Sequence, residues 1–422
     1  MLGVGVSGPR ADADRAVASA TRAPGWDDPA ERDAWTILAT VHGLGPVGLA
    51  ALLERYGSGL AILAEAGASG GLERLTETGR EPRRDGLARR RPINLALATA
   101  IADAAANGAS TLERIEAAGL EVVTVEEPAY PHRLGAIDLP PHLLFVLGSV
   151  AALDPARAVA VVGTRRPTFD GERTAARIAD ALARVGATVV SGLARGIDGI
   201  AHKATLSASG STIAVIGGGH ARMFPPEHAW LAERIAANGG AVVSELGPDV
   251  EATPGTFPRR NRVISGLSDA TVVVEAPARS GALITASWAL EQGRECFLVP
   301  GAIGRRASAG CLSFLREYPG SARIVAGIPQ LLDDLDLIDH DAPAAVSASP
   351  TAEAALAEVG GTAGRIGREL VAGRSTVDEL VAVTGLPVAT VLGALTVLEG
   401  RGLAHDAYGR YRPTGPLALL EP

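Results

Sequence analysis

The chain has 422 residues, of which 47% are hydrophobic, and this length predicts roughly two to four domains with a sizeable core. The formal net charge of −8 argues against non-specific coating of nucleic acid by the whole molecule, so any such binding must come from a local basic patch. Cys296 and Cys311 lack metal-ligand spacing and are too few for a disulfide framework. We therefore expect a protein of the reducing cytoplasm that holds no metal and no other cofactor.

The N-terminal part of the chain has two sections. Residues 1–25 are rich in Ala, Arg and Asp without an apolar run, which favours a disordered start over a signal peptide. Residues 26–120 have helical periodicity, interrupted by an arginine-rich stretch at 80–91 that we interpret as a loop. The Gly-x-Gly turn within His42–Pro46 resembles a helix-hairpin-helix element of a SAM-like domain, whose amides can hold one backbone phosphate. We favour the alternative, a structural turn in a small helical bundle.

Residues 121–340 predict a Rossmann-like α/β domain. Two short β runs, Glu121–Val125 and Leu143–Leu147, precede a repeating pattern of apolar strand, glycine-rich turn and amphipathic helix. The nearly continuous β-branched runs are typical of a doubly wound, mainly parallel sheet that is buried on both faces. The strand candidates of this pattern are Ala158–Val162, Ala187–Val190, Thr212–Ile216, Ala241–Ser244, Ala270–Val274 and Glu295–Val299.

The C-terminal part predicts a linker and a small separate domain. Residues 341–356, including the Ala/Pro/Ser stretch Ala342–Ala355, have no periodicity and indicate a linker. Residues 357–422 fit a winged-helix domain. Its elements would be helices at Arg365–Ala372, Val377–Val383 and Val388–Glu399, then a hairpin at Leu403–Tyr411. From Thr351 to Pro422 there are eight acidic residues and six arginines, so we expect this domain to bind protein or to regulate rather than to grip duplex DNA.

The segment Thr256–Gly266 is the most basic part of the predicted core, with Phe257 and three arginines within its first seven residues. Pro258 can occupy the first turn of a helix, which would place the arginines where backbone N–H groups attract anions. Phe257, expected just outside that helix, offers a flat face for a stacked base. The alternative is a solvated basic turn with Phe257 packed inward. The candidate nucleic-acid contacts here are Phe257, Arg259, Arg260, Asn261 and Arg262.

The turns after the predicted strands carry further candidate phosphate ligands. They contain neither a dinucleotide fingerprint nor a P-loop, but they are rich in Gly, Ser/Thr and cations, which suit several phosphates in a row. The candidates in these turns are Gly163, Thr164, Arg165, Arg166, Arg195, Gly196, Lys203, Gly217, Gly218, Ser280, Gly281 and Thr285.

Four titratable residues of the core invite a catalytic interpretation. Asp198 and His202 are one helical turn apart and could form an acid/base pair, but we favour a capping role for Asp198 and a hydrogen bond from His202 to a neighbouring turn. Glu245 and Glu275 end buried strands without an accompanying nucleophile or metal cluster. For both glutamates we expect structural pairing with nearby arginines, and we assign no catalytic residue.

Taken together, these motifs resemble the DNA-processing DprA/Smf family. The residues that carry the resemblance are Val162–Thr168, Ser191–Asp198 with His202, Phe257–Arg262, Ser280–Ala286, and Ala289–Arg294 with Val299–Gly301. The resemblance implies a bacterial cytosolic homodimer that binds single-stranded DNA without cutting it. It also implies that the protein shields incoming strands during DNA uptake in natural transformation and helps to load the RecA recombinase.

The family pattern transfers to particular positions. By analogy its DNA-contacting arginine falls on Arg165, and its aromatic-basic cluster falls on Phe257, Arg259, Arg260 and Asn261. Two departures weaken the match locally. The family often has Gly-Cys-Asn where this chain has Gly310–Leu312, and a Tyr where this chain has Phe224.

The resulting prediction is a non-catalytic protein that binds single-stranded DNA, with RecA as a partner and no membrane association. The main alternative is a Rossmann-like nucleotide phosphoribohydrolase. Against it, Gly217–Gly219 is followed by His220 and lacks the Thr and Glu that those enzymes carry in their phosphate turn. A winged-helix transcription factor is a third possibility, which the acidic C-terminal domain disfavours.

Overall fold

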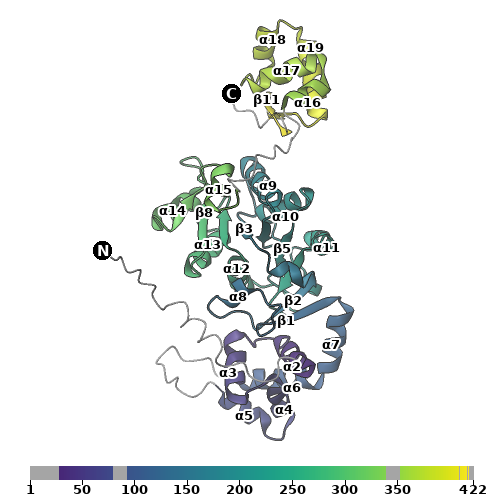
Figure 1. Cartoon of the computed structure of the whole chain (residues 1–422), viewed down its shortest axis with the longest axis vertical. Helices are drawn as coiled ribbons and strands as arrows, with labels where there is room; N and C mark the ends of the chain where they lie inside the picture. The colour runs from purple at the N-terminus through teal and green to yellow at the C-terminus, as the bar shows by residue number, and fades with distance from the viewer. Residues whose placement is uncertain (1–27, 79–92, 339–351, 408, 416, 418–422) are drawn as a thin grey trace, which may run out of the picture. The chain divides into compact units, whose positions relative to one another are not determined.

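The structure is a computed structural model that describes residues 28–78, 93–338, 352–407, 409–415 and 417 (Figure 1). The chain divides into two compact units, Met1–Ile338 and Asp339–Pro422. The predicted disordered start, the loop at 80–91 and most of the predicted linker lie outside the described residues.

The core of the first unit is a nine-stranded sheet. Its strands, in spatial order, are β1 (Leu120–Thr124), β2 (Leu143–Gly148), β6 (Ala241–Ser244), β5 (Thr212–Val215), β4 (Thr188–Ser191), β3 (Ala158–Val162), β7 (Ala270–Val273), β8 (Glu295–Leu298) and β9 (Ala322–Ile324). From β6 to β9 neighbouring strands are parallel, whereas β1 and β2 are antiparallel additions at one edge. The prediction of a mainly parallel Rossmann-like sheet is confirmed. The short edge strand β9 was not predicted.

Helices cover both faces of this sheet, as its strand sequences require. All five residues of β3 are buried, and alternate ones join opposite clusters. One face packs against α12 (Thr256–Gly266), α13 (Gly281–Glu291) and α14 (Ala309–Glu317). The other packs against α9 (Phe169–Arg184), α10 (Ile197–Ser207), α11 (Ala229–Ala237) and α15 (Ile328–Asp334). The strand order reverses between β3 and β7, where open α/β sheets bind ligands.

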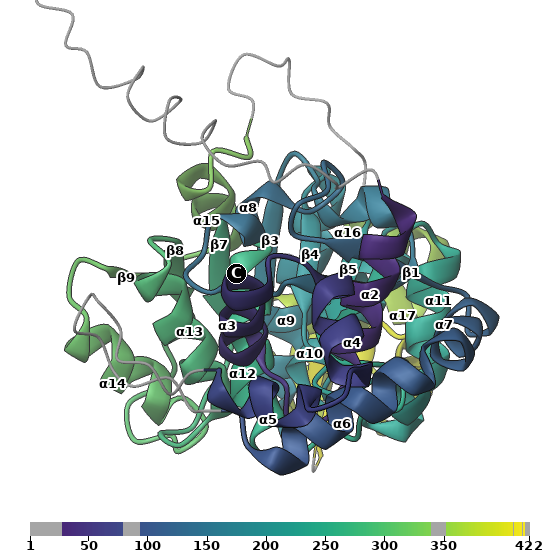
Figure 2. The same cartoon turned by 90° about the horizontal axis from the view of Figure 1, so that it is seen from below.

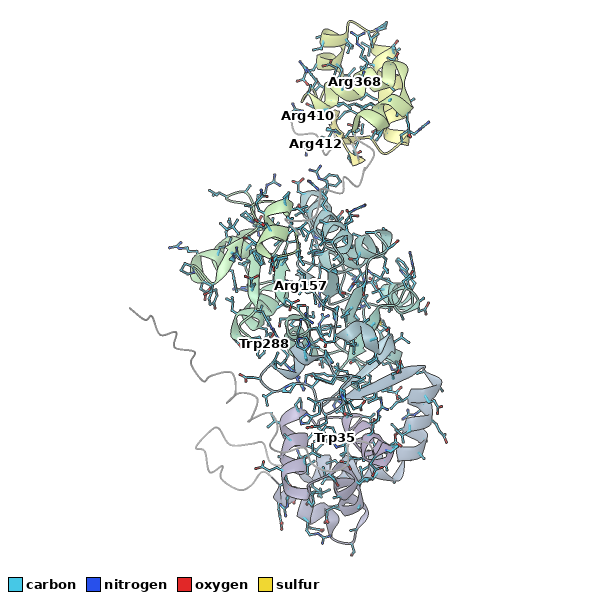
Figure 3. All side chains as sticks on the ribbon, viewed as in Figure 1. Trp35, Arg157, Trp288, Arg368, Arg410 and Arg412 are labelled. Atoms are coloured by element: carbon cyan, nitrogen blue, oxygen red, sulfur yellow. The ribbon has the colours of Figure 1, made fainter. Side chains whose placement is uncertain are left out.

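The N-terminal helices attach to the antiparallel edge of the sheet. They are α2 (Pro29–Ala39), α3 (Pro46–Tyr56), α4 (Gly59–Gly67), α5 (Gly71–Glu77), α6 (Leu95–Ala106) and α7 (Gly108–Ala117), gathered beyond β1 and β2 (Figure 1) and nearest the viewer in Figure 2. Trp35 of α2, labelled in Figure 3, joins this section to the sheet because it packs in one cluster with Ile115 and Phe145. Its indole N–H donates to the Glu31 carboxylate at 2.8 Å, so the buried ring leaves no unmet donor.

In the described part of the second unit there are four helices and a hairpin, α16 (Ala352–Val359), α17 (Gly361–Val371), α18 (Val377–Thr384), α19 (Val388–Gly400), β10 (Ala404–Ala407) and β11 (Arg410–Pro413). The three predicted helices and the antiparallel hairpin are present. The predicted linker extends too far, because α16 begins at Ala352. That segment consists of Ala, Leu, Glu and one Val, mostly strong helix formers, which the linker interpretation of its composition overlooked.

In the part of the chain that the structure describes, no helix alone is long and apolar enough to cross a membrane. Two bent pairs, α3 with α4 and α18 with α19, reach that length and composition only when each pair is taken together.

Candidate nucleic-acid interface

The loop after β3 is held in place by Glu275, which follows β7. The backbone N–H of Thr164 donates to the Glu275 carbonyl at 2.7 Å. The Glu275 carboxylate accepts hydrogen bonds from the backbone N–H of Thr168 at 3.0 Å and from its hydroxyl at 2.6 Å. Glu275 is therefore structural, as expected, but it pairs with a threonine and not with an arginine. The result is a fixed loop at the strand-order reversal that leaves Arg165 and Arg166 exposed.

Arg165 lies against an aromatic pair. Its guanidinium carbon is 5.1 Å from the ring centroid of Phe257, and the rings of Phe257 and Phe224 are 5.7 Å apart and tilted by 58°. Phe257 lies close to Gly217, where any Cβ would come within 2.9 Å of the ring. Phe257 is half-buried and Phe224 is 46% exposed, so both rings keep accessible surface. α12 begins at Thr256, which places Phe257 inside the helix and not before it as predicted.

The sequence suggested that Arg260 faces solvent, but the structure buries it. Its guanidinium donates to the carbonyls of Gly192 and Val215. Burial lowers its pKa to about 10, an effect that the neighbouring Asp198 carboxylate opposes. Burial in turn raises the pKa of Asp198, while Arg260 and the backbone N–H groups of Ala194 and Gly192 act to lower it. Arg260 and Asp198 therefore lie together inside the fold, where the guanidinium anchors α12 through its two hydrogen bonds.

Asn261 and Arg262 are also engaged in the fold. Asn261 donates its side-chain amide to the Gly281 carbonyl at 3.1 Å and so ties α12 to the start of α13. Arg262 is 7% exposed, donates to the Leu139 carbonyl at 2.9 Å and forms an ion pair with Glu245. The expected clustering of the three arginines where the helix N–H groups attract anions is thus wrong for Arg260 and Arg262, because only Arg259 of the three is exposed.

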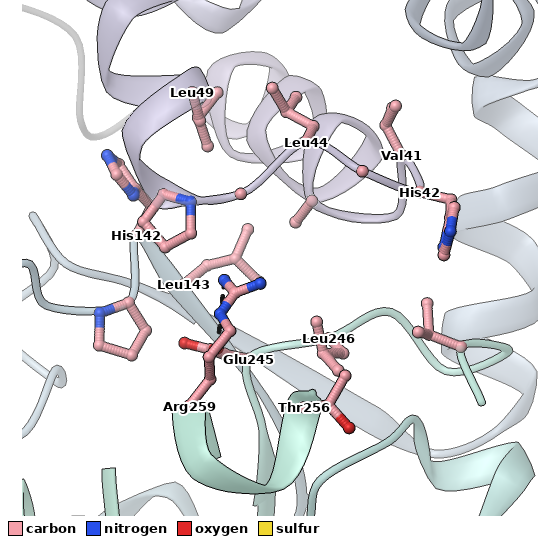
Figure 4. Close-up of a pocket in the computed structure, with 16 residues that line it drawn as sticks. Val41, His42, Leu44, Leu49, His142, Leu143, Glu245, Leu246, Thr256 and Arg259 are labelled. Atoms are coloured by element: carbon pink, nitrogen blue, oxygen red, sulfur yellow. Dashed lines mark ion pairs between the residues drawn. The ribbon is translucent and has the colours of Figure 1, made fainter. Parts of the chain in front are cut away.

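Arg259 points toward the N-terminal helices. Its Nη2 is 3.6 Å from a carboxylate oxygen of Glu245, which confirms the expected arginine pairing of that glutamate. Figure 4 shows the Arg259 side chain in a cavity of about 230 Å³ beneath the glycine turn of His42–Pro46, with His142 beside it. A Cβ at Gly45 would lie 3.5 Å from the Arg259 guanidinium. The glycine turn therefore faces the basic helix at close range.

The main cavity, about 440 Å³ in volume, opens at the strand-order reversal. Ser280 caps α13, its hydroxyl accepting from the Ala282 N–H at 3.3 Å, and the N-terminal amides of α13 lie beside the cavity. Arg279 also lines it and is exposed, although it was missed as a candidate. Its place in the turn after a buried strand was the available signal. Candidate residues that line this cavity are Gly163, Thr164, Arg165, Phe257, Arg260, Asn261, Ser280, Gly281 and Thr285.

The remaining candidates lie outside the main cavity. Arg166 and Arg195 line a neighbouring pocket of about 230 Å³ with Phe224 and Phe257, and Arg195 forms an exposed ion pair with Glu227. Three of the candidate glycines are at close contacts that leave no room for a side chain. A Cβ at Gly196 or Gly218 would meet neighbouring backbone, and a Cβ at Gly217 would meet the Phe257 ring. Lys203 stands on α10 above the ring of Trp230.

Asp198 and His202 do not form an acid/base pair. His202 is fully buried, and its Nδ1 is 2.7 Å from the hydroxyl of Thr212, which itself donates to the Val189 carbonyl. Because that hydroxyl proton is engaged, we assign Nδ1–H as the donor of a neutral imidazole. Desolvation, with smaller contributions from the charges of His228 and Arg260, lowers the pKa of His202 to about 3.

A cavity lined by Arg165, Arg279 and Phe257 at the strand-order reversal of a doubly wound sheet places this chain among Rossmann-like proteins. The family model described as DNA recombination-mediator protein A matches residues 121–336, and the chain belongs to this family. Its resemblance to DprA/Smf proteins is thereby confirmed.

Individual relatives agree with this assignment. Protein Smf of Escherichia coli (strain K12) is 39% identical over 305 residues, which cover 72% of this chain and 79% of that protein. The DNA processing protein DprA of Bacillus subtilis (strain 168) is 39% identical over 199 residues, covering 47% and 67% respectively. The X-ray structure of DprA from Streptococcus pneumoniae superposes with a TM-score of 0.56 at 29% identity, covering 72% of this chain and 97% of that chain.

The buried neutral His202 predicts acid sensitivity of the fold. The unfolded histidine takes up a proton near pH 6.5, whereas the folded one does so only near pH 3. Its contribution to the free energy of unfolding is therefore complete above pH 6.5 and is lost as pH falls toward 3, by about 2 kcal/mol at pH 5. Denaturant unfolding of the wild type and of His202→Asn across this range should show a shallower pH dependence in the variant. Parallel curves would contradict the assignment.

Proposed function

We propose that this protein binds single-stranded DNA along the edge formed by the loop after β3, the start of α12 and the start of α13. The observation that carries the proposal is the stacking of the Arg165 guanidinium on Phe257, with the second ring of Phe224 beside it. In this arrangement a cation for the phosphate and a ring for the base lie close enough together for a single nucleotide to contact both. The α13 amides and Arg279 supply further anion contacts in the same cavity.

The geometry favours single strands over duplex. A stacking face is useful only for a base that has left its pair, since duplex bases are already stacked on one another. The chain as a whole carries a net charge of −8, so the local cations and not the whole surface must attract the DNA.

We further propose that binding is not coupled to catalysis. The carboxylate of Glu275 is occupied by Thr168, and that of Asp198 is buried beside Arg260. Neither is placed as a free general base at the cavity. These engagements, together with the family assignment, disfavour the nucleotide phosphoribohydrolase alternative.

The family supports a cellular role as well. We propose a cytoplasmic homodimer that protects incoming or recombining single strands and promotes loading of the RecA recombinase during natural transformation. The proposed domains are a helical SAM/helix-hairpin-helix-like domain (26–120), the DNA-binding core (121–340) and a C-terminal winged helix (357–422). Arg259, beneath the glycine turn of the helical domain, would add a phosphate contact away from the main cavity.

We propose that the winged-helix domain docks protein. The last of its four described helices, α19, would occupy the position of a recognition helix, yet its sequence contains one glutamate and no cation. Val388 and Val397 on that helix are about half exposed. The arginines of the hairpin, Arg410 and Arg412 in Figure 3, are outweighed by the acidic residues of the domain. A partly apolar helix with one carboxylate and no cation is poorly suited to a phosphate backbone.

The contributions of Arg165 and Phe257 should differ in kind. Arg165→Ala removes a charge-assisted contact, which should cost about 1–3 kcal/mol of binding free energy and flatten the salt slope of log affinity by about 0.7. Phe257→Ala should cost about 1–3 kcal/mol through lost stacking and leave the slope unchanged, because no counterion is released. Titrations of an oligodeoxythymidylate over a salt series measure both quantities.

Two controls make this experiment selective. Arg157 precedes β3 at the opposite, amino end of the strand and pairs with Asp336 at 3.2 Å, so Arg157→Ala should change neither affinity nor slope. Phe257→Tyr keeps the aromatic face and should bind nearly as the wild type does. If Phe257→Ala instead lowers the melting temperature while its folded fraction binds normally, Phe257 belongs to the core and not to the site.

Removal of the C-terminal unit should not weaken DNA binding by the core. A chain that ends at about Ala344 lacks a domain of net charge −2, which repels phosphate more than it attracts it. Its affinity for single-stranded DNA should stay within a few fold of the full chain in a direct binding titration. A hundredfold loss would show that the winged helix is part of the DNA site.

A further inference from the structure

A second group of aromatic and cationic side chains lies on α10 and α11, outside the cavity described above. Trp230 is 43% exposed. The Lys203 ammonium is 5.5 Å from its ring centroid, and the guanidinium carbon of Arg234 is 5.7 Å from it. Lys203 is the single lysine among 39 basic residues, and it stands on the aromatic ring. A solvent-accessible tryptophan flanked by two exposed cations has the composition of a single-strand binding platform.

This group is connected to the proposed DNA edge through one continuous segment. From Phe224 the chain runs through the 3-10 turn η3 (Pro226–His228) directly into α11. His228 anchors the turn by bonding the Leu193 carbonyl at 2.8 Å, and it packs so closely on α10 that a Cβ at Gly199 would lie 2.6 Å from its ring.

The same face of α10 carries Lys203. Gly199 and Lys203 are four residues apart, one helical turn, so the face that meets His228 continues to the lysine above Trp230. From Ile197, the first residue of α10, to Lys203 the helix rises about 9 Å, a length that a stacked strand covers in roughly three nucleotides at about 3.4 Å each. Arg195, next to the pocket of Phe224 and Phe257, stands at the near end of this path.

We infer that Trp230 is a second base-stacking subsite, at which a nucleobase of single-stranded DNA lies on the indole while Lys203 and Arg234 contact the flanking phosphates. The inference rests on the proposed function and extends its site along α10. A protein partner is less well matched to this surface, since lysine is depleted at protein interfaces and here Lys203 lies against the ring. The carboxylate of Glu227, near the path, is already neutralised by Arg195.

The subsite predicts a dependence on oligonucleotide length. Affinities should be measured for oligodeoxythymidylates of about 3 and about 20 nucleotides, because the path along α10 alone takes roughly three nucleotides and the shorter strand is too short to occupy Phe257 and Trp230 together. The long strand reaches Trp230, whereas the short one is held at Arg165 and Phe257. Trp230→Ala should therefore weaken binding of the long strand roughly five- to a hundredfold and leave the short strand within twofold. Trp230→Phe, which keeps a flat ring, should restore most of the long-strand affinity.

Other results would overturn the inference. Unchanged long-strand affinity in Trp230→Ala would assign the indole to another role, including protein docking. An equal loss at both lengths, accompanied by a lower melting temperature that Trp230→Phe does not share, would make Trp230 a structural residue of α11. If the wild type binds neither strand, the proposed function itself fails, and this outcome is distinct from a failure at Trp230 alone.

Discussion

The buried guanidinium of Arg260 holds together the edge of the sheet at which we propose that DNA binds. Its hydrogen bonds to the carbonyls of Gly192 and Val215 join α12 to the ends of β4 and β5. Asp198 supplies the opposing charge, and the close fit leaves no room at Gly192, where a Cβ would lie 2.1 Å from the guanidinium. Removing either charge would leave the other buried without compensation, which typically costs several kcal/mol. Because α12 is fixed in this way, Phe257 lies against Gly217 and within reach of Arg165.

The basic helix thus divides its arginines between two tasks. Arg260 and Arg262 have their charges balanced inside the fold, by Asp198 and Glu245, while Arg259 remains exposed. The proposed DNA contacts come instead from several elements, with Arg165 after β3, Arg279 after β7 and Lys203 on α10. Such a distributed patch would let a protein of net charge −8 attract a phosphate chain along one edge without coating its whole surface with DNA.

The strands of the sheet could be predicted from the sequence, whereas the side-chain contacts at its edge could not. The strands were predictable because nearly continuous β-branched runs such as Ala158–Val162 have few alternatives in a soluble domain. β9 was missed because its three residues, one buried, one partly buried and one exposed, are too few to give a periodic signal. Which arginines are buried could not be predicted, since their partners are distant in sequence: Asp198 precedes Arg260 by more than sixty residues, and Glu245 reaches Arg262 only through the fold. The structural role of Glu275 was predicted correctly, but its partner, Thr168, was not.

The central claim, that this edge binds single strands through local cations and aromatic rings, is tested most directly by the salt dependence of binding in the wild type. A single-stranded oligonucleotide and the duplex of the same sequence should be titrated over a range of salt concentrations. We predict tighter binding of the single strand and, if about four to six cations meet phosphates, a slope of log affinity against log salt of roughly −3 to −4. Equal affinity for the duplex, or a slope near zero, would contradict the account.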